Sequence, residues 1–160
     1  MSKPLVVIIM GSKADAAHSQ KIAEAALQFG LDVVQRIGSA HKTPAHVLEF
    51  LAEYEADARA KVYMTVAGRS NALSGFVDGA VSAPVIACPP PTDALGGADL
   101  YSSLRMPSGI APAVVLEPAN AALLAAKILG LVDAQVHQQV LAFQQQQVKK
   151  VIDDDASQNR

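Results

Sequence analysis

The sequence predicts an α/β protein with a single domain, built as a three-layer α/β/α sandwich. Short apolar runs alternate along the chain with longer segments in which apolar residues recur at helical spacing. Most of the apolar runs lack polar alternation, which is typical of parallel strands covered by helices on both faces. The chain has 160 residues, 51% of them apolar, which suits one hydrophobic core rather than two. These observations predict right-handed crossovers and a parallel sheet of about five strands.

The first half of the chain contains three of these strands, which are expected at residues 5–10, 32–37 and 62–67. Residues 13–29 carry apolar side chains at near-helical spacing, and Gly30 is placed to end this helix in a left-handed turn. Thr43 and Pro44 are a typical N-cap and first helical residue, so a second helix is expected to begin there.

The second half continues the alternation with shorter elements. Residues 70–81 predict a weaker helix, in which Gly75 and Gly79 would let another segment pack closely. The remaining elements are expected at residues 84–88 (strand, ended by three prolines), 98–104 (short helix), 113–116 (strand), 118–131 (helix) and 133–152 (helix). The domain is therefore expected to span residues 1–152, followed by a polar, frayed tail at 153–160, and we expect a flavodoxin-like strand order.

Composition restricts the class of partner. The formal net charge of −2, without a basic cluster, argues against nucleic acid as the main partner. The single cysteine, Cys88, permits no internal disulfide, and it closes an apolar strand, so we expect it to be buried and to have no catalytic role. Neither a signal-like N-terminus nor an apolar run of about 18 residues is present, which predicts a cytoplasmic protein with no membrane partner. The low content of charged residues and the many alanines leave much of the surface with few polar groups, which predicts that copies of the chain cover it in a homo-oligomer.

Three polar segments follow the first three strands, at the sheet edge where open α/β proteins bind ligands. In the first, Gly11, Ser12 and Asp15 open a helix and offer backbone N–H groups to an anion such as phosphate, although Ser12 or Asp15 could simply cap the helix. No G-x-G-x-x-G or Walker motif is present, which argues against nicotinamide and ATP as ligands.

The second polar segment places His41 between Ser39 and Lys42. Histidine exchanges a proton near neutral pH, and the adjacent Lys42 cation favours the neutral form, which can act as a base. A loop histidine taken alone is more often solvated or structural.

The third polar segment contains Gly68, Arg69, Ser70 and Asn71. It places a guanidinium, a hydroxyl and an amide at the same edge, although Ser70 could simply cap a helix. No histidine has a cysteine or carboxylate at zinc-ligand spacing, so no metal site is expected.

Several motifs together resemble one known family. They are Gly11-Ser12 with Asp15, Ser39-Ala40-His41-Lys42, Gly68-Arg69-Ser70-Asn71, Cys88-Pro89-Pro90, and Ser103-Leu104-Arg105-Met106-Pro107-Ser108-Gly109. In this order and spacing they resemble the aminoimidazole ribonucleotide carboxylase family of purine biosynthesis, over nearly the whole chain to about Val148. The resemblance favours the functional interpretation of His41 and Ser70 over the structural one.

This family has two branches, and the motifs resemble one of them. The mutase branch, which moves a carboxylate from the exocyclic amine to ring carbon 4, has a Gly-Gly-Ala-Ala-His third loop, an arginine after the site histidine, and Gln-Met-Pro-Arg-Gly. The direct carboxylase branch, which uses CO2, has His-Lys, Gly-Arg-Ser-Asn, Cys-Pro-Pro and Leu-Arg-(Leu/Met)-Pro-Ser-Gly. The chain follows the second pattern at all four places. The resemblance therefore implies a phosphoribosylaminoimidazole carboxylase that uses no ATP, metal or biotin and needs no cofactor.

The resemblance also implies roles for the site residues. His41 is the expected base that removes the proton from carbon 4, with Lys42 steadying the new carboxylate or the phosphate. The expected contacts to ribose and phosphate come from Gly11, Ser12, Asp15, Ser39 and Lys42, and the expected CO2 or carboxylate pocket consists of Gly68, Arg69, Ser70 and Asn71. Ala14 stands where relatives commonly carry serine, so backbone donors would do more of the phosphate binding.

Two alternative functions remain open at this point. The nearer one is the mutase, and the other is a non-catalytic flavodoxin-like module that binds a nucleotide without converting it. The resemblance also implies a tetramer or octamer, with aminoimidazole ribonucleotide and CO2 as the small-molecule partners.

Overall fold

The computed structural model describes residues 2–158, and its centre is a sheet of five parallel strands. The strands are β1 (Leu5–Met10), β2 (Asp32–Ile37), β3 (Lys61–Val66), β4 (Val85–Ala87) and β5 (Ala113–Val114). Their order across the sheet is β2-β1-β3-β4-β5, and every neighbouring pair is parallel. This is the flavodoxin-like order, so the predicted fold class is confirmed.

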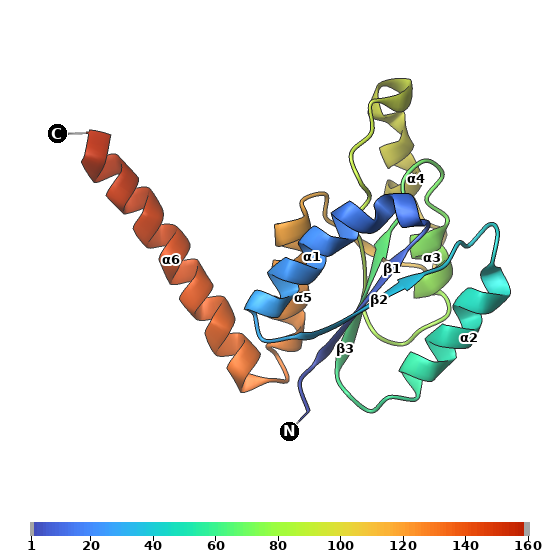
Figure 1. Cartoon of the computed structure of the whole chain (residues 1–160), viewed down its shortest axis with the longest axis horizontal. Helices are drawn as coiled ribbons and strands as arrows, with labels where there is room; N and C mark the ends of the chain where they lie inside the picture. Colours follow the sequence, from blue (N-terminus) through green and yellow to red (C-terminus); the bar gives the residue numbers. More distant parts are fainter. Residues whose placement is uncertain (1, 159–160) are drawn as a thin grey trace.

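Helices cover both faces of this sheet and make the three layers visible in Figure 1. The elements are η1 (Lys13–Asp15), α1 (Ala16–Gln28), α2 (Pro44–Glu55), α3 (Leu73–Asp78), η2 (Ala94–Leu100), α4 (Tyr101–Leu104), α5 (Pro118–Leu129) and α6 (Ala134–Gln158). Apolar residues of α1, α5 and the start of α6 pack on one face, and those of α2 and α3 pack on the other.

Strand β1 is covered by helices on both faces, which explains why its sequence shows no polar alternation. Every residue of β1 is buried, because successive side chains enter opposite layers. Val6 and Ile8 lie in the cluster with α1 and α5, whereas Val7 and Ile9 lie in the cluster with α2 and α3.

The segment after β3 differs from its prediction. Helix α3 covers only Leu73–Asp78 instead of residues 70–81, because residues 69–71 are held by contacts to α4 that are described below. Its glycines do allow close packing, since a Cβ on Gly75 would lie 3.0 Å from the Met106 sulfur, and one on Gly79 would lie 3.1 Å from Ile110 Cδ1. Residues 94–100 are irregular because Leu95 and two glycines adopt positive φ.

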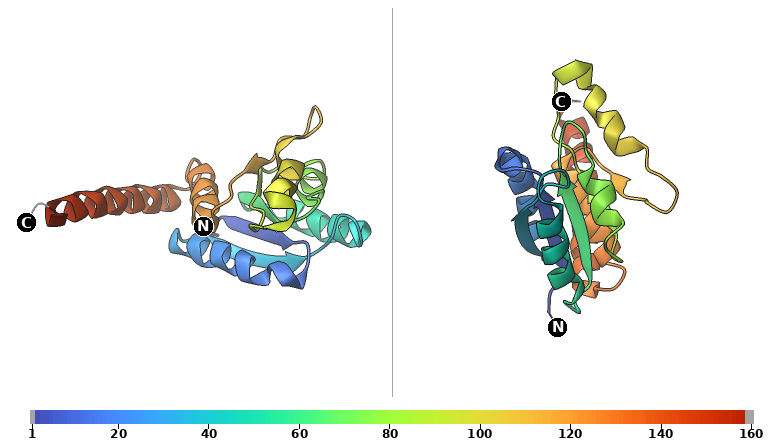
Figure 2. Two further views of the ribbon diagram at one scale, coloured as in Figure 1. Left: turned by 90° about the horizontal axis from the view of Figure 1, so that it is seen from above. Right: turned by 90° about the vertical axis from the view of Figure 1, so that its right-hand side faces the viewer.

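Helix α6 leaves the body of the protein. Its first turns pack on the core through Val136 and Val140, and Phe143 contacts Phe29 with ring centroids 5.4 Å apart. We expected this helix to end at Ile152, but it continues to Gln158. The two remaining tail residues lie outside the described part of the chain. Figures 1 and 2 show that its second half extends away from the sheet.

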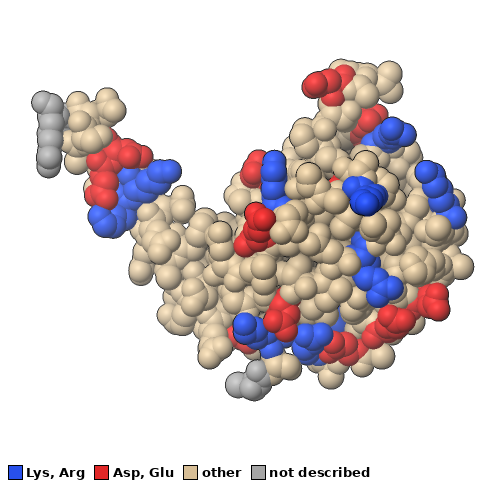
Figure 3. Space-filling view, viewed as in Figure 1, with Lys and Arg blue, Asp and Glu red and all other residues tan. Residues whose placement is uncertain are grey.

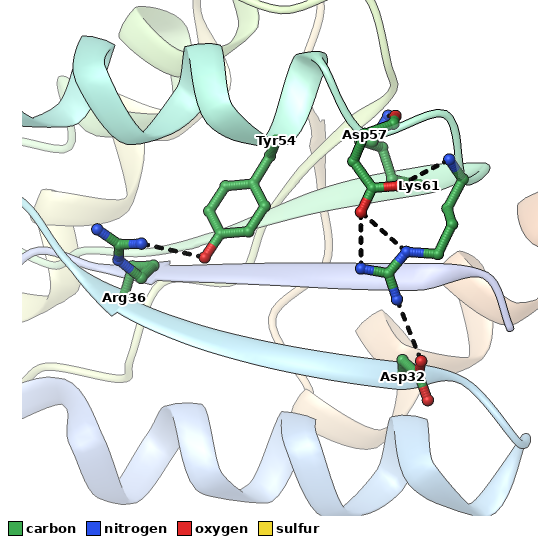
Figure 4. Close-up of polar contacts among 6 residues, drawn as sticks. Asp32, Arg36, Tyr54, Asp57 and Lys61 are labelled. Atoms are coloured by element: carbon green, nitrogen blue, oxygen red, sulfur yellow. Dashed lines mark hydrogen bonds and ion pairs between the residues drawn. The ribbon is translucent and has the colours of Figure 1, made fainter. Parts of the chain in front are cut away.

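Charged side chains are dispersed over the body. On the face shown in Figure 3, acidic and basic groups are interspersed, and a further mixed group lies near the free end of α6. At the amino end of the sheet, Arg59 joins Asp57 at 2.7 Å and Asp32 at 3.1 Å. Nearer the carboxyl end of β2, Arg36 donates to the Tyr54 hydroxyl at 3.2 Å (Figure 4). Within residues 2–158, no helix is both long and apolar enough to span a bilayer.

Candidate functional site

The segments after β1, β2 and β3 begin next to one another. The Gly38 N–H donates to the Met10 carbonyl at 3.0 Å, and the Gly11 N–H donates to the Val66 carbonyl at 2.9 Å. A Cβ on Gly11 would lie 3.5 Å from Ala67 Cβ. All three predicted site segments therefore begin at the carboxyl edge of the parallel sheet, with those after β2 and β3 on either side of the one after β1.

The first segment forms the cap that we considered as its alternative role. The Asp15 carboxylate accepts the Ser12 N–H at 3.0 Å and the Ser12 hydroxyl at 3.1 Å, and the Asp15 N–H donates to the Ser12 carbonyl. Ser12 is exposed and Asp15 is half-buried. The pair therefore fixes the start of η1, and the exposed Ser12 stays accessible to a ligand.

The second segment is a tight turn whose apex carries His41 and Lys42. The Ser39 hydroxyl accepts the Lys42 N–H at 3.2 Å, and the Thr43 N–H donates to the Ser39 carbonyl at 2.9 Å. His41 and Lys42 are exposed, and within residues 2–158 the His41 ring makes no hydrogen bond. The expected helix start is confirmed, with Thr43 as N-cap and Pro44 first in α2.

The third segment, after β3, mixes exposed and buried groups. Arg69 and Ser70 are exposed, and Arg69 has a φ of +57°, in the left-handed region that non-glycine residues rarely adopt. Asn71 is only 3% exposed, and its amide donates to the Ser103 hydroxyl at 2.9 Å while accepting the Ser74 N–H at 3.2 Å. Asn71 therefore shapes the loop from within, whereas Arg69 and Ser70 face solvent.

A cavity of about 470 Å³ opens beside this edge, on the side of α1 and α5. Of the residues we predicted for the site, it includes only Gly68. Its lining is His18, Lys21, Ala67, Gly68, Pro89, Pro90, Pro91, Thr92, Gly97, Asp99, Leu100, Leu116, Glu117 and Pro118. The exposed His41 turn lies outside it.

Cys88 lies under this cavity and contacts His18. The Cys88 Sγ is 3.4 Å from His18 Nε2 and 3.6 Å from the Leu116 carbonyl oxygen. Burial, together with Glu117, raises the pKa of the Cys88 thiol to about 12. Burial, and then the nearby Lys21 cation, lower the pKa of His18. Cys88 is fully buried, as expected, and it is protonated at neutral pH, which is unlike a nucleophilic cysteine.

Sequence reasoning gave no role to three residues that contact this site. His18 and Ser102 were not among the predicted site residues, and Ser103 was named only as the first residue of the Ser103–Gly109 motif. The hydroxyls of both serines hold the loop after β3, across a sequence separation of 31 and 32 residues. The available signal in the sequence was the place of Ser103 in the family motif, next to Leu104. Among residues 2–158, no three histidine, cysteine or acidic side chains gather as a metal site.

Comparisons with known proteins agree on one family. The AIR carboxylase family profile matches residues 5–150. A Treponema denticola protein named phosphoribosylaminoimidazole carboxylase is 56% identical over 99% of both chains, and one of the same name from Archaeoglobus fulgidus is 57% identical over 91% of this chain and 79% of its own. The crystal structure of Treponema denticola PurE superposes with a TM-score of 0.97 at 56% identity, covering 99% of this chain and all of that one. The chain belongs to the AIR carboxylase family.

Proposed function

We propose that the protein is a phosphoribosylaminoimidazole carboxylase of purine biosynthesis, which joins CO2 to carbon 4 of aminoimidazole ribonucleotide. The observation that carries the proposal is the common starting point of three loops at the carboxyl edge of the sheet, around β1. Two of those loops contain two of the four motifs by which the sequence resembles the direct carboxylase branch, His41-Lys42 and Gly68-Arg69-Ser70-Asn71. The printed names of the two relatives are those of carboxylases, which supports the same choice.

The ribose phosphate of the substrate would bind across the first two loops. Ser12 and Lys42 are exposed and supply a hydroxyl and a cation, both of which suit a phosphate. The Asp15 carboxylate only accepts hydrogen bonds, so it suits ribose hydroxyls better than phosphate. Gly11 and Ser39 bring backbone close to the same place, and Ala14 contributes no hydroxyl.

The aminoimidazole ring of the substrate would then lie between the His41 turn and the loop after β3. Carbon 4 of this aminoimidazole is enamine-like and nucleophilic, so it attacks CO2 without an activating cofactor. The proposed pocket for CO2 and the new carboxylate is the loop of Gly68, Arg69, Ser70 and Asn71. Arg69 and Ser70 offer donors to the developing carboxylate, while Gly68 lets the substrate approach the backbone closely.

His41 would complete the reaction as general base. Attack on CO2 leaves a proton on carbon 4, and removing it restores the aromatic ring. A neutral imidazole with no competing hydrogen bond can take that proton, and in the reverse direction it would return the proton. Lys42 would steady the carboxylate or the phosphate.

A His41→Ala variant tests whether the protein is an enzyme or a binding module. We expect it to bind aminoimidazole ribonucleotide nearly as well as the wild type but to lose about 10²- to 10⁴-fold in turnover, the usual contribution of a general base. Isothermal titration and an absorbance assay measure the two quantities. The matched control is His46→Ala, since His46 is another exposed histidine on the following helix. Wild-type protein that binds the nucleotide but converts none of it would support the binding module instead.

A further inference from the structure

Helix α4 fixes the conformation of the loop that carries Arg69. Because Arg69 adopts a left-handed backbone conformation, the loop stays in place only where neighbouring groups hold it. The hydroxyl of Ser102 is placed to do this. It accepts the Asn71 N–H at 2.9 Å and lies 3.0 Å from the Arg69 carbonyl oxygen, so it contacts the backbone on both sides of Ser70.

The adjacent Ser103 holds the same loop through a side chain. Its hydroxyl accepts the side-chain N–H of Asn71 at 2.9 Å, and the side-chain oxygen of Asn71 accepts the N–H of Ser74, the second residue of α3. Ser103 is 2% exposed and Asn71 is 3% exposed, so water does not compete well for these bonds. The buried Asn71–Ser103 pair therefore holds the loop through a side chain, while the Ser102 hydroxyl contacts the loop backbone at Arg69 and Asn71.

The Ser102 hydroxyl has two carbonyl acceptors but only one proton to donate. The Asp99 carbonyl lies 2.7 Å away, within the same turn of helix, and the Arg69 carbonyl lies 3.0 Å away. Asp99 also lines the cavity. The hydroxyl therefore lies between a residue of the cavity lining and the Arg69 backbone, and the two carbonyls compete for its one proton.

We propose that Ser102 is a positioning residue, whose hydroxyl holds Arg69 and Asn71 so that the Arg69 and Ser70 side chains face the carboxylate formed on the substrate. This rests on the proposed carboxylase function. The residue acts through Arg69 and Ser70, and it does not contact the nucleotide phosphate.

The test compares three variants. Ser102→Ala removes the hydroxyl, Ser102→Thr keeps it, and Tyr101→Phe removes a hydroxyl from the exposed neighbouring residue of α4. For Ser102→Ala we expect kcat to fall about tenfold, with the Kd for aminoimidazole ribonucleotide unchanged within about twofold. We also expect hydrogen exchange of the Asn71 backbone N–H, which the Ser102 hydroxyl accepts, to become about tenfold faster. Ser102→Thr should restore both values, and Tyr101→Phe should change neither.

The outcomes separate this proposal from the carboxylase function. If Ser102→Ala keeps wild-type kcat and Asn71 exchange, or if its kcat and nucleotide affinity fall in the same proportion, Ser102 is not a positioning residue. Loss of kcat in Ser102→Thr equal to that in Ser102→Ala would also overturn the proposal. If the wild type converts no aminoimidazole ribonucleotide at all, the carboxylase function fails, whereas hydrogen exchange still reports the loop contact.

Discussion

Gly38 lies between β2 and the His41 turn and packs against helix α2. A Cβ at this position would lie 2.6 Å from Val47 Cγ2 and 3.0 Å from the Phe50 ring, and both side chains are buried. A larger residue would therefore push the turn away from the helix. No other residue type fits between β2 and α2 at this distance without movement.

A Gly38→Ala substitution should consequently destabilise the fold and displace the turn. We expect a loss of about 1–3 kcal/mol in the free energy of unfolding, the usual cost of overpacking. Urea denaturation measures it. Gly11→Ala is the matched stability control, because its Cβ would make only ordinary contacts, the nearest at 3.5 Å. Equal stability of the two variants would contradict this interpretation of Gly38.

Glu55 links α2 to β3 and to the segment before β4. Its carboxylate accepts the Tyr63 hydroxyl at 2.8 Å, the Ser82 hydroxyl at 2.8 Å and the Ser82 N–H at 3.0 Å. Burial by itself would raise the pKa of Glu55, but the hydrogen bonds from Ser82 and Tyr63 outweigh burial, so the pKa lies below its ordinary value of 4.5. Burial, followed by the bond to Glu55, raises the pKa of Tyr63.

This shift predicts how stability depends on pH. A carboxyl with a lowered pKa in the folded state contributes stability that is complete above the unfolded value and is lost as pH falls through the folded value. Glu55→Gln should therefore lower the free energy of unfolding at pH 7. In this variant the free energy of unfolding should also fall less steeply than in the wild type as the pH drops below about 4.5. Urea denaturation at several pH values tests this, with the exposed Glu49→Gln as control. An unchanged decline in Glu55→Gln would contradict the assignment.

At the scale of elements, the ends of β1 and β2 were predicted correctly because each is a short run bounded by turn residues. The short helix expected at residues 98–104 is also confirmed, since the end of η2 continues into α4 and stops at Leu104. The start of helix α3 was predicted wrongly, because it depends on contacts between residues about 31 positions apart in sequence, such as Asn71 with Ser102. The extension of α6 was missed because its polar residues are compatible with either a helix or a frayed tail.

The same limit applied to the candidate site. The edge at which the polar loops start could be predicted, because parallel strands place their carboxyl ends together. The burial of Asn71 and its bond to Ser103 could not, because no local pattern reports a partner so distant in the chain. Asp15 was named for both of its possible roles, and the structure places it in the cap.

Helix α6 has a packed half and an exposed half, which predicts two different mutational effects. Val140 is 5% exposed and packs on the core, whereas Val148 is 60% exposed. Val140→Ala should cost about 2 kcal/mol of unfolding free energy, because it removes two buried methyl groups. Val148→Ala should change stability by less than about 0.5 kcal/mol in the monomer. Similar losses in both variants at low protein concentration would show that the outer half of α6 is also packed.

At the scale of the whole molecule, the homo-oligomer remains a prediction. Leu131, Val132, Val148, Val151 and Ile152 are all more than half exposed, which is consistent with burial between copies of the chain. Light scattering of purified protein measures the mass in solution, and we expect that of a tetramer or octamer. A stable monomer with full activity would contradict the prediction.

An absorbance assay tests the central claim most directly. Purified protein is mixed with aminoimidazole ribonucleotide and bicarbonate in one cuvette, and with the preformed N5-carboxyamino isomer in another, with no ATP or metal in either. Product from the first mixture alone is the result we predict for a direct carboxylase. Product from the isomer alone would show that the protein is the mutase and would contradict our assignment of the branch.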